Sequence, residues 1–353
     1  MGIIIIITII IPDLKNIPKS NSPLVIAEIA QAHEGSLGIA HSYIDAASNA
    51  GVDAVKFQTH IASAESTLSE PWRVKFSNQD ATRYDYWKRM EFSKEQWKEL
   101  YEHSRERNML FISSPFSIEA VELLLETGID AWKVASGELN NTTLFEMIAE
   151  TGLPVFVSTG MSNYDEIDKA VEFFKNKGTD LTLMQCTSLY PTPAGKTGLN
   201  LISEFRERYH CNIGLSDHSG NIFTGLAACA LGANAIEVHI TFSKESFGPD
   251  VPASITIDEL KVLTEGVKFI FDAINNPVDK NTIAEEFKDM KKIFNKSIVA
   301  RYDLKKGSLL DRSILSFKKP GNGLSPDKLN QLIGKRLKRD IKTDELIMLS
   351  DIE

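Results

Sequence analysis

Cysteine is scarce in this chain, which has only Cys186, Cys211 and Cys229 among 353 residues. No two of them form a CxxC pair, and the odd count argues against a disulfide framework and against a zinc ribbon. Thiols that are not needed for disulfides are typical of a reducing compartment, so the composition predicts a cytoplasmic location.

Long hydrophobic runs are also missing. The one membrane-like stretch, IIIIITIII at 3–11, falls far short of the roughly 20 apolar residues that a spanning helix needs. It lacks the basic flank and the small-residue cleavage site of a signal peptide. Because β-branched residues favour strands, we predict an N-terminal strand or hairpin segment over 1–22 and no membrane partner.

Positive charge is in deficit overall, but not at the C-terminal end. The formal net charge is −9, yet the residues from Lys291 to Glu353 include 15 Lys and Arg against 8 Asp and Glu. This change in composition predicts a domain boundary near residue 285. No RNP, zinc-finger or Walker motif accompanies the basic stretch, so we expect no nucleic-acid partner. A basic module that docks on an acidic body is the preferred interpretation.

Short apolar runs alternate with amphipathic helical patterns between residues 23 and 275. Eight runs are typical of buried parallel strands, namely 24–30, 53–58, 109–114, 130–136, 154–159, 181–187, 212–217 and 235–240. Eight strand–helix units over about 250 residues predict a (β/α)₈ TIM barrel. The alternative, an open doubly wound sheet, lacks support because no GxGxxG follows the first run.

Beyond the barrel the chain turns polar and then strand-like again. We predict a linker with a short helix over 276–293 and a small β-rich domain over 294–353, built from the pieces SIVARYDL, SLLDRSILSFKK and ELIMLSDIE.

The connection from about Thr59 to Phe92 is too long for an ordinary loop of a barrel. Long ordered loops are usually functional; the alternative is an insertion that packs on the barrel rim or on a partner subunit.

The carboxyl ends of barrel strands hold the active site, and two lysines lie at those ends. Lys56 and Lys133 would be costly there unless they meet an anion or a carboxylate. Hydroxyls recur at the neighbouring strand ends, at Ser114, Ser136, Ser158 and Ser216. The pattern indicates a cradle for phosphate and carboxylate; the alternative is a pair of Lys–Glu contacts inside the barrel.

Two histidines end adjacent predicted strands. His218 and His239 lie near carboxylates, and paired imidazoles in such surroundings suit a divalent transition metal such as Mn, Fe, Co or Zn. The alternative is a helix-capping histidine beside an ordinary core histidine.

These strand ends together resemble the sialic acid (N-acetylneuraminate) synthase family. The resemblance rests on AEIAQAHEGS (27–36), DAVKFQTH (53–60), LFISSPFS (110–117), WKVASGELNN (132–141), VSTGMS (157–162), QCTSLYPTP (185–193), GLSDHS (214–219), IEVHI (236–240) and GPD (248–250). KKPGNG (318–323) and the GK at 334–335 are similar to the antifreeze-like (SAF) domain of that family.

The resemblance implies a reaction and its partners. Members of the family condense phosphoenolpyruvate with an N-acylated hexosamine, N-acetylmannosamine or a modified relative, to a nine-carbon 2-keto acid and release phosphate. They are phosphoenolpyruvate-dependent transferases that need a divalent metal, Mn²⁺ above all, with Mg²⁺ or Co²⁺ possible. They form homodimers in which the SAF domain of one chain covers the barrel mouth of the other.

The resemblance also assigns roles to residues of this chain. It implies that His218 and His239 bind the metal and that Glu28 and Glu237 are the catalytic carboxylates. Phosphoenolpyruvate would be held by Lys56, Ser114, Lys133, Ser136, Ser158, Ser188 and Ser216. The sugar would contact Gln58, Asn78, Tyr190, Asp250 and Lys319.

Several positions depart from the family pattern, and most of them belong to the sugar half. The family's GxNH is AQAH at 30–33 here, its HCT is QCT at 185–187, an Asn is replaced by Ser188, and an Arg before PGNG is replaced by Lys319. We therefore expect the same reaction with a modified hexosamine, such as one that leads to a legionaminic- or pseudaminic-type acid. Two alternatives are a synthase that acts on a phosphorylated aldose and a non-catalytic sugar-binding barrel.

Overall fold

The computed structural model describes residues 22–353. The predicted N-terminal strand over 1–22 therefore lies almost entirely outside the described residues. Beyond it, the chain divides after Asn275 into two compact units, the second being Asn276–Glu353. In the described part of the chain, no helix is both long and apolar enough to cross a lipid bilayer.

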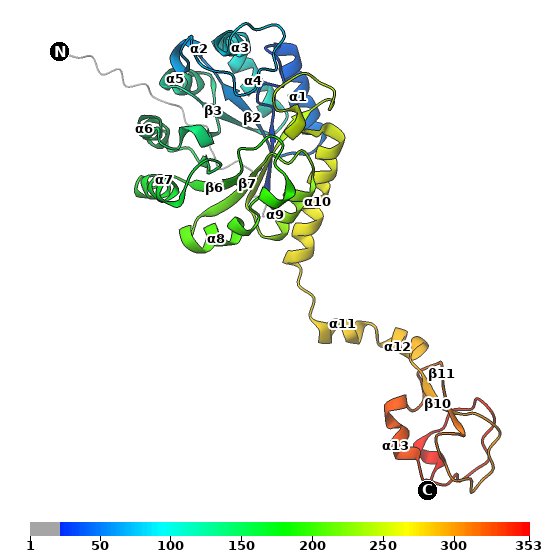
Figure 1. Cartoon of the computed structure of the whole chain (residues 1–353). Coiled ribbons are helices and arrows are strands. Elements are labelled where there is room, and N and C mark those ends of the chain that lie inside the picture. The colour runs from blue at the N-terminus through cyan, green and yellow to red at the C-terminus, as the bar shows by residue number, and fades with distance from the viewer. Residues whose placement is uncertain (1–21) are drawn as a thin grey trace. The chain divides into compact units, whose positions relative to one another are not determined.

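The first unit is a closed parallel barrel, as the sequence predicts (Figure 1). Its strands are β1 (Leu24–Glu28), β2 (Ala54–Thr59), β3 (Leu110–Pro115), β4 (Ala131–Val134), β5 (Val155–Ser158), β6 (Leu181–Cys186), β7 (Asn212–Asp217) and β8 (Ala235–Thr241). Each strand pairs with the next, and β1 pairs with β8 from Leu24↔Ala235 to Glu28↔His239. A two-residue strand, β9 (Ile255–Thr256), extends the sheet beside β8.

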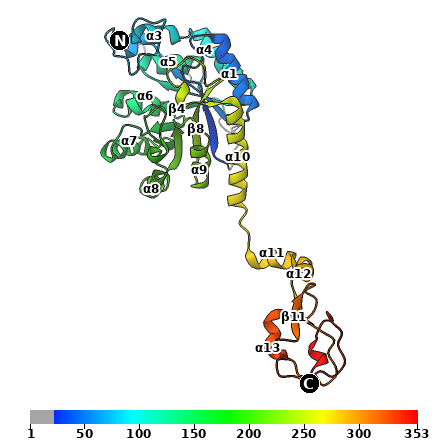
Figure 2. The ribbon, with the colours of Figure 1, turned by 45° about the vertical axis from the view of Figure 1, so that its right-hand side comes forward.

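Helices surround the strands (Figures 1 and 2). They are α1 (Leu37–Asn49), α4 (Lys94–Glu106), α5 (Ile118–Thr127), α6 (Thr142–Glu150), α7 (Tyr164–Asn176), α8 (Asn200–Tyr209), α9 (Phe223–Ala230) and α10 (Ile257–Asn275). Polar residues set several of their starts: Ser93 caps α4 and Asn163 caps α7, each in a reciprocal capping box with the residue three positions on. Such boxes satisfy two backbone N–H groups that a helix start leaves without partners.

The barrel interior changes from an apolar layer to a mainly polar layer toward the carboxyl ends of the strands. Its lower layer is a small apolar cluster of Ile26, Ala54, Leu110, Ile112, Ala131, Phe156, Met184 and Ala235. Side chains alternate along a strand, so the residue two positions further on points to the same side. From the last cluster residue of seven strands, this spacing leads to Glu28, Lys56, Ser114, Lys133, Ser158, Cys186 and Glu237, and from Gly214 on β7 it leads to Ser216. The fold thus places one polar layer above the apolar layer.

The long connection after β2 is ordered and carries two helices, α2 (Ala62–Glu65) and α3 (Arg83–Met90). Aromatic rings pack it together and onto the barrel rim: Phe76 lies 5.0 Å from the Tyr86 ring and 5.6 Å from the Phe247 ring. Arg89 ties it further by ion pairs to Asp80 and Glu34. The connection therefore forms a fixed wall above the strand ends.

The second unit has its own small core. It begins with two helices, α11 (Lys280–Glu286) and α12 (Lys288–Phe294), which lie within the predicted linker and at its edge. β10 (Ser297–Ala300) and β11 (Leu315–Lys318) then form an antiparallel pair. The predicted strand piece ELIMLSDIE forms isolated bridges and a short 3₁₀ helix, η6 (Leu349–Asp351), instead of a strand. Short helices also interrupt the unit at η5 (Pro326–Lys328) and α13 (Leu329–Leu332).

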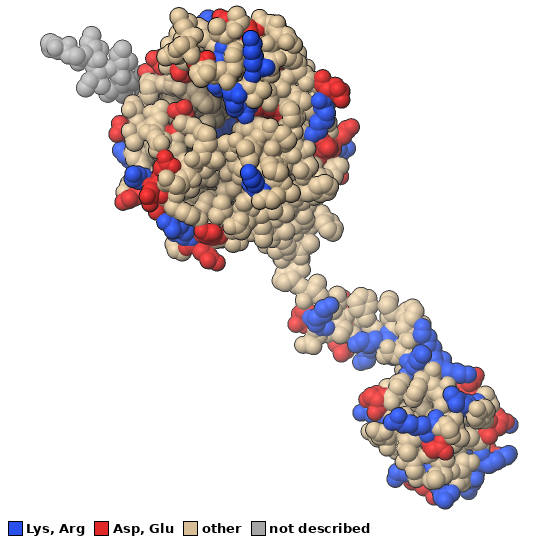
Figure 3. Space-filling view, viewed as in Figure 1, with Lys and Arg blue, Asp and Glu red and all other residues tan. Residues whose placement is uncertain are grey.

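Charge distinguishes the surface of the second unit. Lys and Arg side chains cover much of the face that Figure 3 shows, with fewer Asp and Glu among them. Its core is made of ten buried aliphatic residues, from Ile298 to Ile352, so its stability rests on few large side chains.

Candidate functional site

A cavity of about 520 Å³ opens at the carboxyl ends of the barrel strands. It brings together fourteen of the predicted site residues: Glu28, Lys56, Gln58, Ser114, Lys133, Ser136, Ser158, Ser188, Tyr190, Ser216, His218, Glu237, His239 and Asp250. Asn78 is exposed and is not among the lining residues. Lys319 belongs to the second unit, where its ammonium lies 4.9 Å from the ring centre of Phe294.

A buried network of two lysines and two carboxylates forms the floor of the cavity. Lys56 Nζ lies 2.7 Å from Glu28 Oε1 and 3.4 Å from Glu237 Oε1. Lys133 Nζ lies 2.6 Å from Glu237 Oε2. The predicted Lys–Glu contacts are therefore present. Both lysines also line the cavity, as the predicted anion cradle requires.

Burial and neighbouring charges have opposite effects on the pKa values of this network. Burial disfavours the charged form of Lys56, but the carboxylates of Glu237 and Glu28 outweigh it and raise the pKa of that lysine. Burial lowers the pKa of Lys133 despite its pairing with Glu237. Burial would raise the pKa of Glu237, yet the charges of Lys133 and then Lys56 hold it below its usual value.

Hydroxyl groups extend the network along the neighbouring strands. Ser216 Oγ accepts from Lys133 Nζ at 2.9 Å and lies 3.3 Å from Ser158 Oγ. Ser136 Oγ accepts from the backbone N–H of Gly160 at 3.0 Å. A Cβ at Gly160 would come within 2.4 Å of Ser188 Oγ, so this backbone approaches the hydroxyls as only glycine can. Ammonium groups beside rotatable hydroxyls are suited to bind phosphate and carboxylate oxygens.

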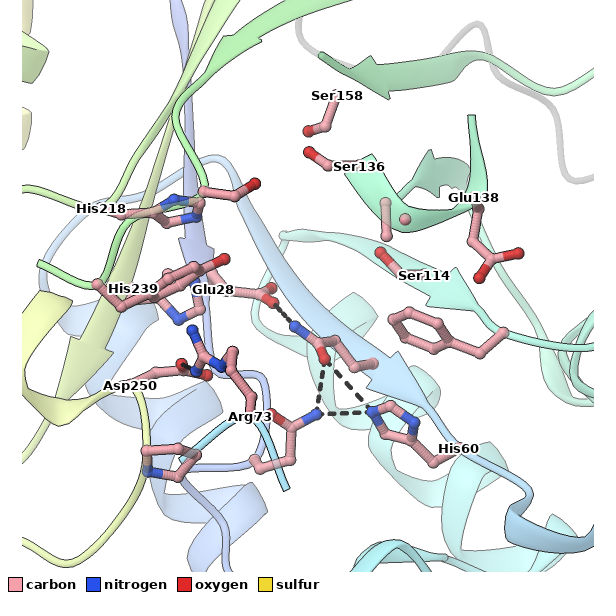
Figure 4. Close-up of a pocket in the computed structure, with 18 of the residues that line it drawn as sticks. Glu28, His60, Arg73, Ser114, Ser136, Glu138, Ser158, His218, His239 and Asp250 are labelled. Carbon is pink, nitrogen blue, oxygen red and sulfur yellow. Dashed lines mark hydrogen bonds and ion pairs between the residues drawn. The ribbon is translucent and has the colours of Figure 1, made fainter. Parts of the chain in front are cut away.

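The two predicted metal ligands lie side by side at the ends of β7 and β8. The ring centres of His218 and His239 are 5.2 Å apart, and Figure 4 shows both beside Glu28. Nδ1 of His218 lies 2.9 Å from the Thr187 carbonyl oxygen, which can only accept, so Nδ1 carries the proton and Nε2 keeps its lone pair. Burial, and then the nearby His239, lowers the pKa of His218 to about 3.

These features fit a metal in part. A neutral imidazole held by a carbonyl at its other nitrogen is the usual form of a histidine ligand. Among residues 22–353, however, no group of three or more His, Cys, Asp or Glu side chains converges as a metal site. A metal held by His218 and His239 would therefore take its remaining ligands from water or substrate.

A cation that the sequence reasoning missed lies in the cavity beside Tyr190 and Asp250, two residues predicted to contact the sugar. Arg73 donates to Asp250 Oδ1 at 3.0 Å, and its guanidinium lies 4.4 Å from the ring centre of Tyr190 (Figure 4). Tyr190 in turn stacks on His218 at 4.1 Å. The aromatic and charged composition of the long connection was the signal for this wall, but it did not single out Arg73.

A chain of amides also escaped the sequence reasoning. Gln58 donates to Glu28 Oε1 at 2.8 Å, Gln31 donates to Gln58 Oε1 at 2.7 Å, and Gln31 also contacts His60 Nε2 at 2.7 Å. His60 Nδ1 lies 2.7 Å from Glu65 Oε1. The connected groups run from the cavity floor to helix α2, and Figure 4 shows the part from Glu28 to His60 as dashed lines.

Comparison with known proteins gives the same assignment at the level of sequence and fold. The NeuB family matches residues 43–279, and the SAF domain matches residues 295–353. N,N'-diacetyllegionaminic acid synthase from Campylobacter jejuni is 34% identical over 92% of this chain and 98% of its own length. Human N-acetylneuraminate-9-phosphate synthase is 32% identical over 92% of this chain and 91% of its own length.

A solved structure agrees with these relatives. The N-acetylneuraminic acid (sialic acid) synthetase of Leptospira borgpetersenii is 31% identical, covers 76% of this chain and 92% of its own, and superposes with a TM-score of 0.67. The family match spans more than half of the chain, and the relatives span nearly all of it. The resemblance seen at the strand ends is thereby confirmed, and the chain belongs to the NeuB family of sialic-acid-type synthases, with a C-terminal SAF domain.

Proposed function

We propose that this enzyme condenses phosphoenolpyruvate with a free N-acylated hexosamine to a nine-carbon, sialic-type 2-keto acid and releases phosphate. The observation that carries the proposal is the buried Lys56–Glu28 and Lys133–Glu237 network beneath a ring of hydroxyls, directly beside two adjacent imidazoles. Such a floor offers fixed cations for an anionic substrate and fixed carboxylates for the charge that develops in the reaction.

The phosphoenolpyruvate half follows from the charges on the floor. Lys56 and Lys133 would hold the phosphate and carboxylate of phosphoenolpyruvate, with the hydroxyls of Ser158 and Ser216 completing the contacts. Among the described residues, Glu28 Oε2 is buried without a hydrogen-bond partner, so that oxygen would face the positive charge that builds at carbon 2. Glu237 would then act as the general acid and base as water adds to carbon 2 and phosphate leaves.

The acceptor half favours a sugar without phosphate. Its wall includes four carboxylates: Glu65, Glu70, Glu138 and Asp250. The two arginines that line it are already paired, Arg73 with Asp250 and Arg83 with Glu70. A phosphate ester would meet more negative than positive charge there, whereas acylamino and hydroxyl groups would find both donors and acceptors. An acceptor with added acylamino groups fits this mixture of groups.

A divalent metal, Mn²⁺ in the first place with Mg²⁺ or Co²⁺ as alternatives, is part of the proposal. His218 and His239 would hold it, and it would supply Lewis-acid polarisation of the sugar's aldehyde oxygen. The orientation of His218 by the Thr187 carbonyl supports this role.

We also propose that the enzyme works as a homodimer whose basic SAF domain covers the acidic barrel of the partner, with Lys319 reaching the sugar half. The contrast in charge between the two parts of the sequence supports docking of this kind. All three cysteines are free thiols, which supports a cytoplasmic location.

The reaction can be tested by phosphate release. The enzyme is incubated with phosphoenolpyruvate and Mn²⁺ and with each of a panel of free N-acylated hexosamines and phosphorylated aldoses. We expect release with at least one free amino sugar and loss of release with a chelator. Release with phosphorylated aldoses alone would overturn the proposed acceptor, and binding of a sugar without any release would favour a non-catalytic barrel.

A further inference from the structure

His60 occupies a buried position next to the cavity that no part of the proposed reaction uses. It is 4% exposed and lies between two aromatic rings, with Trp87 at 4.0 Å and Phe116 at 4.5 Å, both nearly parallel to the imidazole. Its two nitrogens make different contacts: Nδ1 meets Glu65, while Nε2 lies 2.7 Å from the amide nitrogen of Gln31 and 3.3 Å from Gln58 Oε1. Stacking holds the ring plane, so the contacts are fixed in direction.

The contacts decide which nitrogen of His60 carries a proton. A carboxylate only accepts, so Nδ1 must donate to Glu65 Oε1. The amide nitrogen of Gln31 is the nearer of the two groups at Nε2 and only donates, so Nε2 accepts from it. Glu65 thereby selects the neutral tautomer of His60 that leaves a lone pair on Nε2.

The tautomer then orients two amides in series. Gln31 presents its nitrogen both to His60 Nε2 and to Gln58 Oε1, at 2.7 Å in each case. Since its carbonyl is engaged by Gln31, Gln58 turns its own nitrogen toward Glu28 Oε1, at 2.8 Å. Each group in the series leaves its neighbour only one favourable orientation.

We propose that His60 is a positioning residue for Glu28: held by Glu65, it fixes the amides of Gln31 and Gln58 so that an N–H points at the Glu28 carboxylate. The inference rests on the proposed function, in which Glu28 faces the positive charge at carbon 2. It adds a reason why helix α2 lies against the cavity, since α2 supplies Glu65.

Two variants separate positioning from mere packing. In His60→Gln, a side-chain oxygen can still accept from Gln31, so we expect near wild-type kcat at neutral pH. In His60→Phe, stacking remains but the acceptor is gone, and we expect kcat to fall about tenfold, the loss of one hydrogen bond. The KM for phosphoenolpyruvate should change less than twofold in either. Equal kcat losses in both variants would overturn the proposal.

A spectroscopic test does not depend on turnover. In ¹⁵N-histidine NMR of the full chain at neutral pH, the signals that vanish in His60→Gln should be those of a neutral ring protonated at Nδ1. A ring protonated at Nε2, or at both nitrogens, would overturn the proposal even if the enzyme proves active. If no acceptor supports turnover, the proposed function fails, and this measurement still decides the orientation of His60.

Discussion

Arg73 of the long connection donates to Asp250 across 3.0 Å while its guanidinium lies 4.4 Å from the ring centre of Tyr190. The three residues come from distant parts of the sequence and meet only because the connection folds over the strand ends. Among residues 22–353, one N–H of Arg73 makes this pair, and a guanidinium has four more. In the proposed function these donors would face the acceptor sugar.

Arg73 should therefore determine how well the acceptor binds. We expect Arg73→Gln to raise the KM of the acceptor about tenfold, as for the loss of a charge-assisted hydrogen bond, and to leave the KM of phosphoenolpyruvate unchanged. Arg73→Lys should recover part of the loss because lysine keeps the charge but not the planar fork. Arg208→Gln is the matched control, since Arg208 pairs with Asp168 at the surface outside the cavity. An equal rise in both KM values for Arg73→Gln would contradict this assignment.

Glu237 should stabilise the fold in a pH-dependent way. The lysine charges lower its folded pKa from the ordinary 4.5 to about 2, so its contribution is fully present above pH 4.5 and is lost as the pH falls through about 2. In Glu237→Gln we expect a loss of about 3 kcal/mol in the free energy of unfolding at neutral pH, because two buried ammonium groups lose a partner. Urea unfolding across the acid range measures the difference, which should shrink as pH falls. A difference that stays constant would contradict the charge argument.

The imidazole pair should be needed to bind Mn²⁺. His218→Asn should weaken Mn²⁺ binding by 10-fold or more, because one of two protein ligands is lost, and calorimetric titration measures this without substrate. His103→Asn is the control, since His103 lies on α4 and contacts Asp45 there. Unchanged Mn²⁺ affinity in His218→Asn would refute the metal assignment.

Gly160 should be required for binding phosphoenolpyruvate. A Cβ there would lie 2.4 Å from Ser188 Oγ and 2.8 Å from Ser136 Oγ, so Gly160→Ala must displace hydroxyls of the anion cradle. We expect the KM of phosphoenolpyruvate to rise about tenfold, the effect of one misplaced charge-assisted contact. Gly195→Ala, where nothing lies within 4 Å of the added Cβ, should behave as the wild type. A Gly160→Ala enzyme with wild-type KM would mean that the cradle lies elsewhere.

The parts of the fold that follow from local periodicity could be predicted from the sequence. Eight apolar runs gave eight strands, and alternation along them put Lys56, Lys133 and Glu237 in one layer. In the C-terminal unit the same reasoning overestimated strand content, because a small core can be closed by single bridges such as Val299↔Leu346. Short pieces with strand-like composition do not reveal how many partners they find.

The contacts that depend on the path of the long connection could not be predicted. Arg73 and His60 carry no local pattern that separates them from other polar residues of that segment, and each acquires its partners only by tertiary packing. Asn78 shows the converse, since a position assigned within the same segment by resemblance is exposed and is not among the cavity-lining residues. Spacing places residues on strands well, but it does not place them within a long loop.

The central claim is that a free amino sugar, and not its phosphate ester, is the acceptor for phosphoenolpyruvate. The most direct test compares N-acetylmannosamine and a 2,4-diacetamido-6-deoxyhexose with N-acetylmannosamine 6-phosphate, using ¹³C-labelled phosphoenolpyruvate and mass spectrometry of the product. We expect a nine-carbon 2-keto acid that carries the label with a free sugar, formed with a higher kcat/KM than any product of the phosphate ester. Labelled product from the phosphate ester alone would contradict the account.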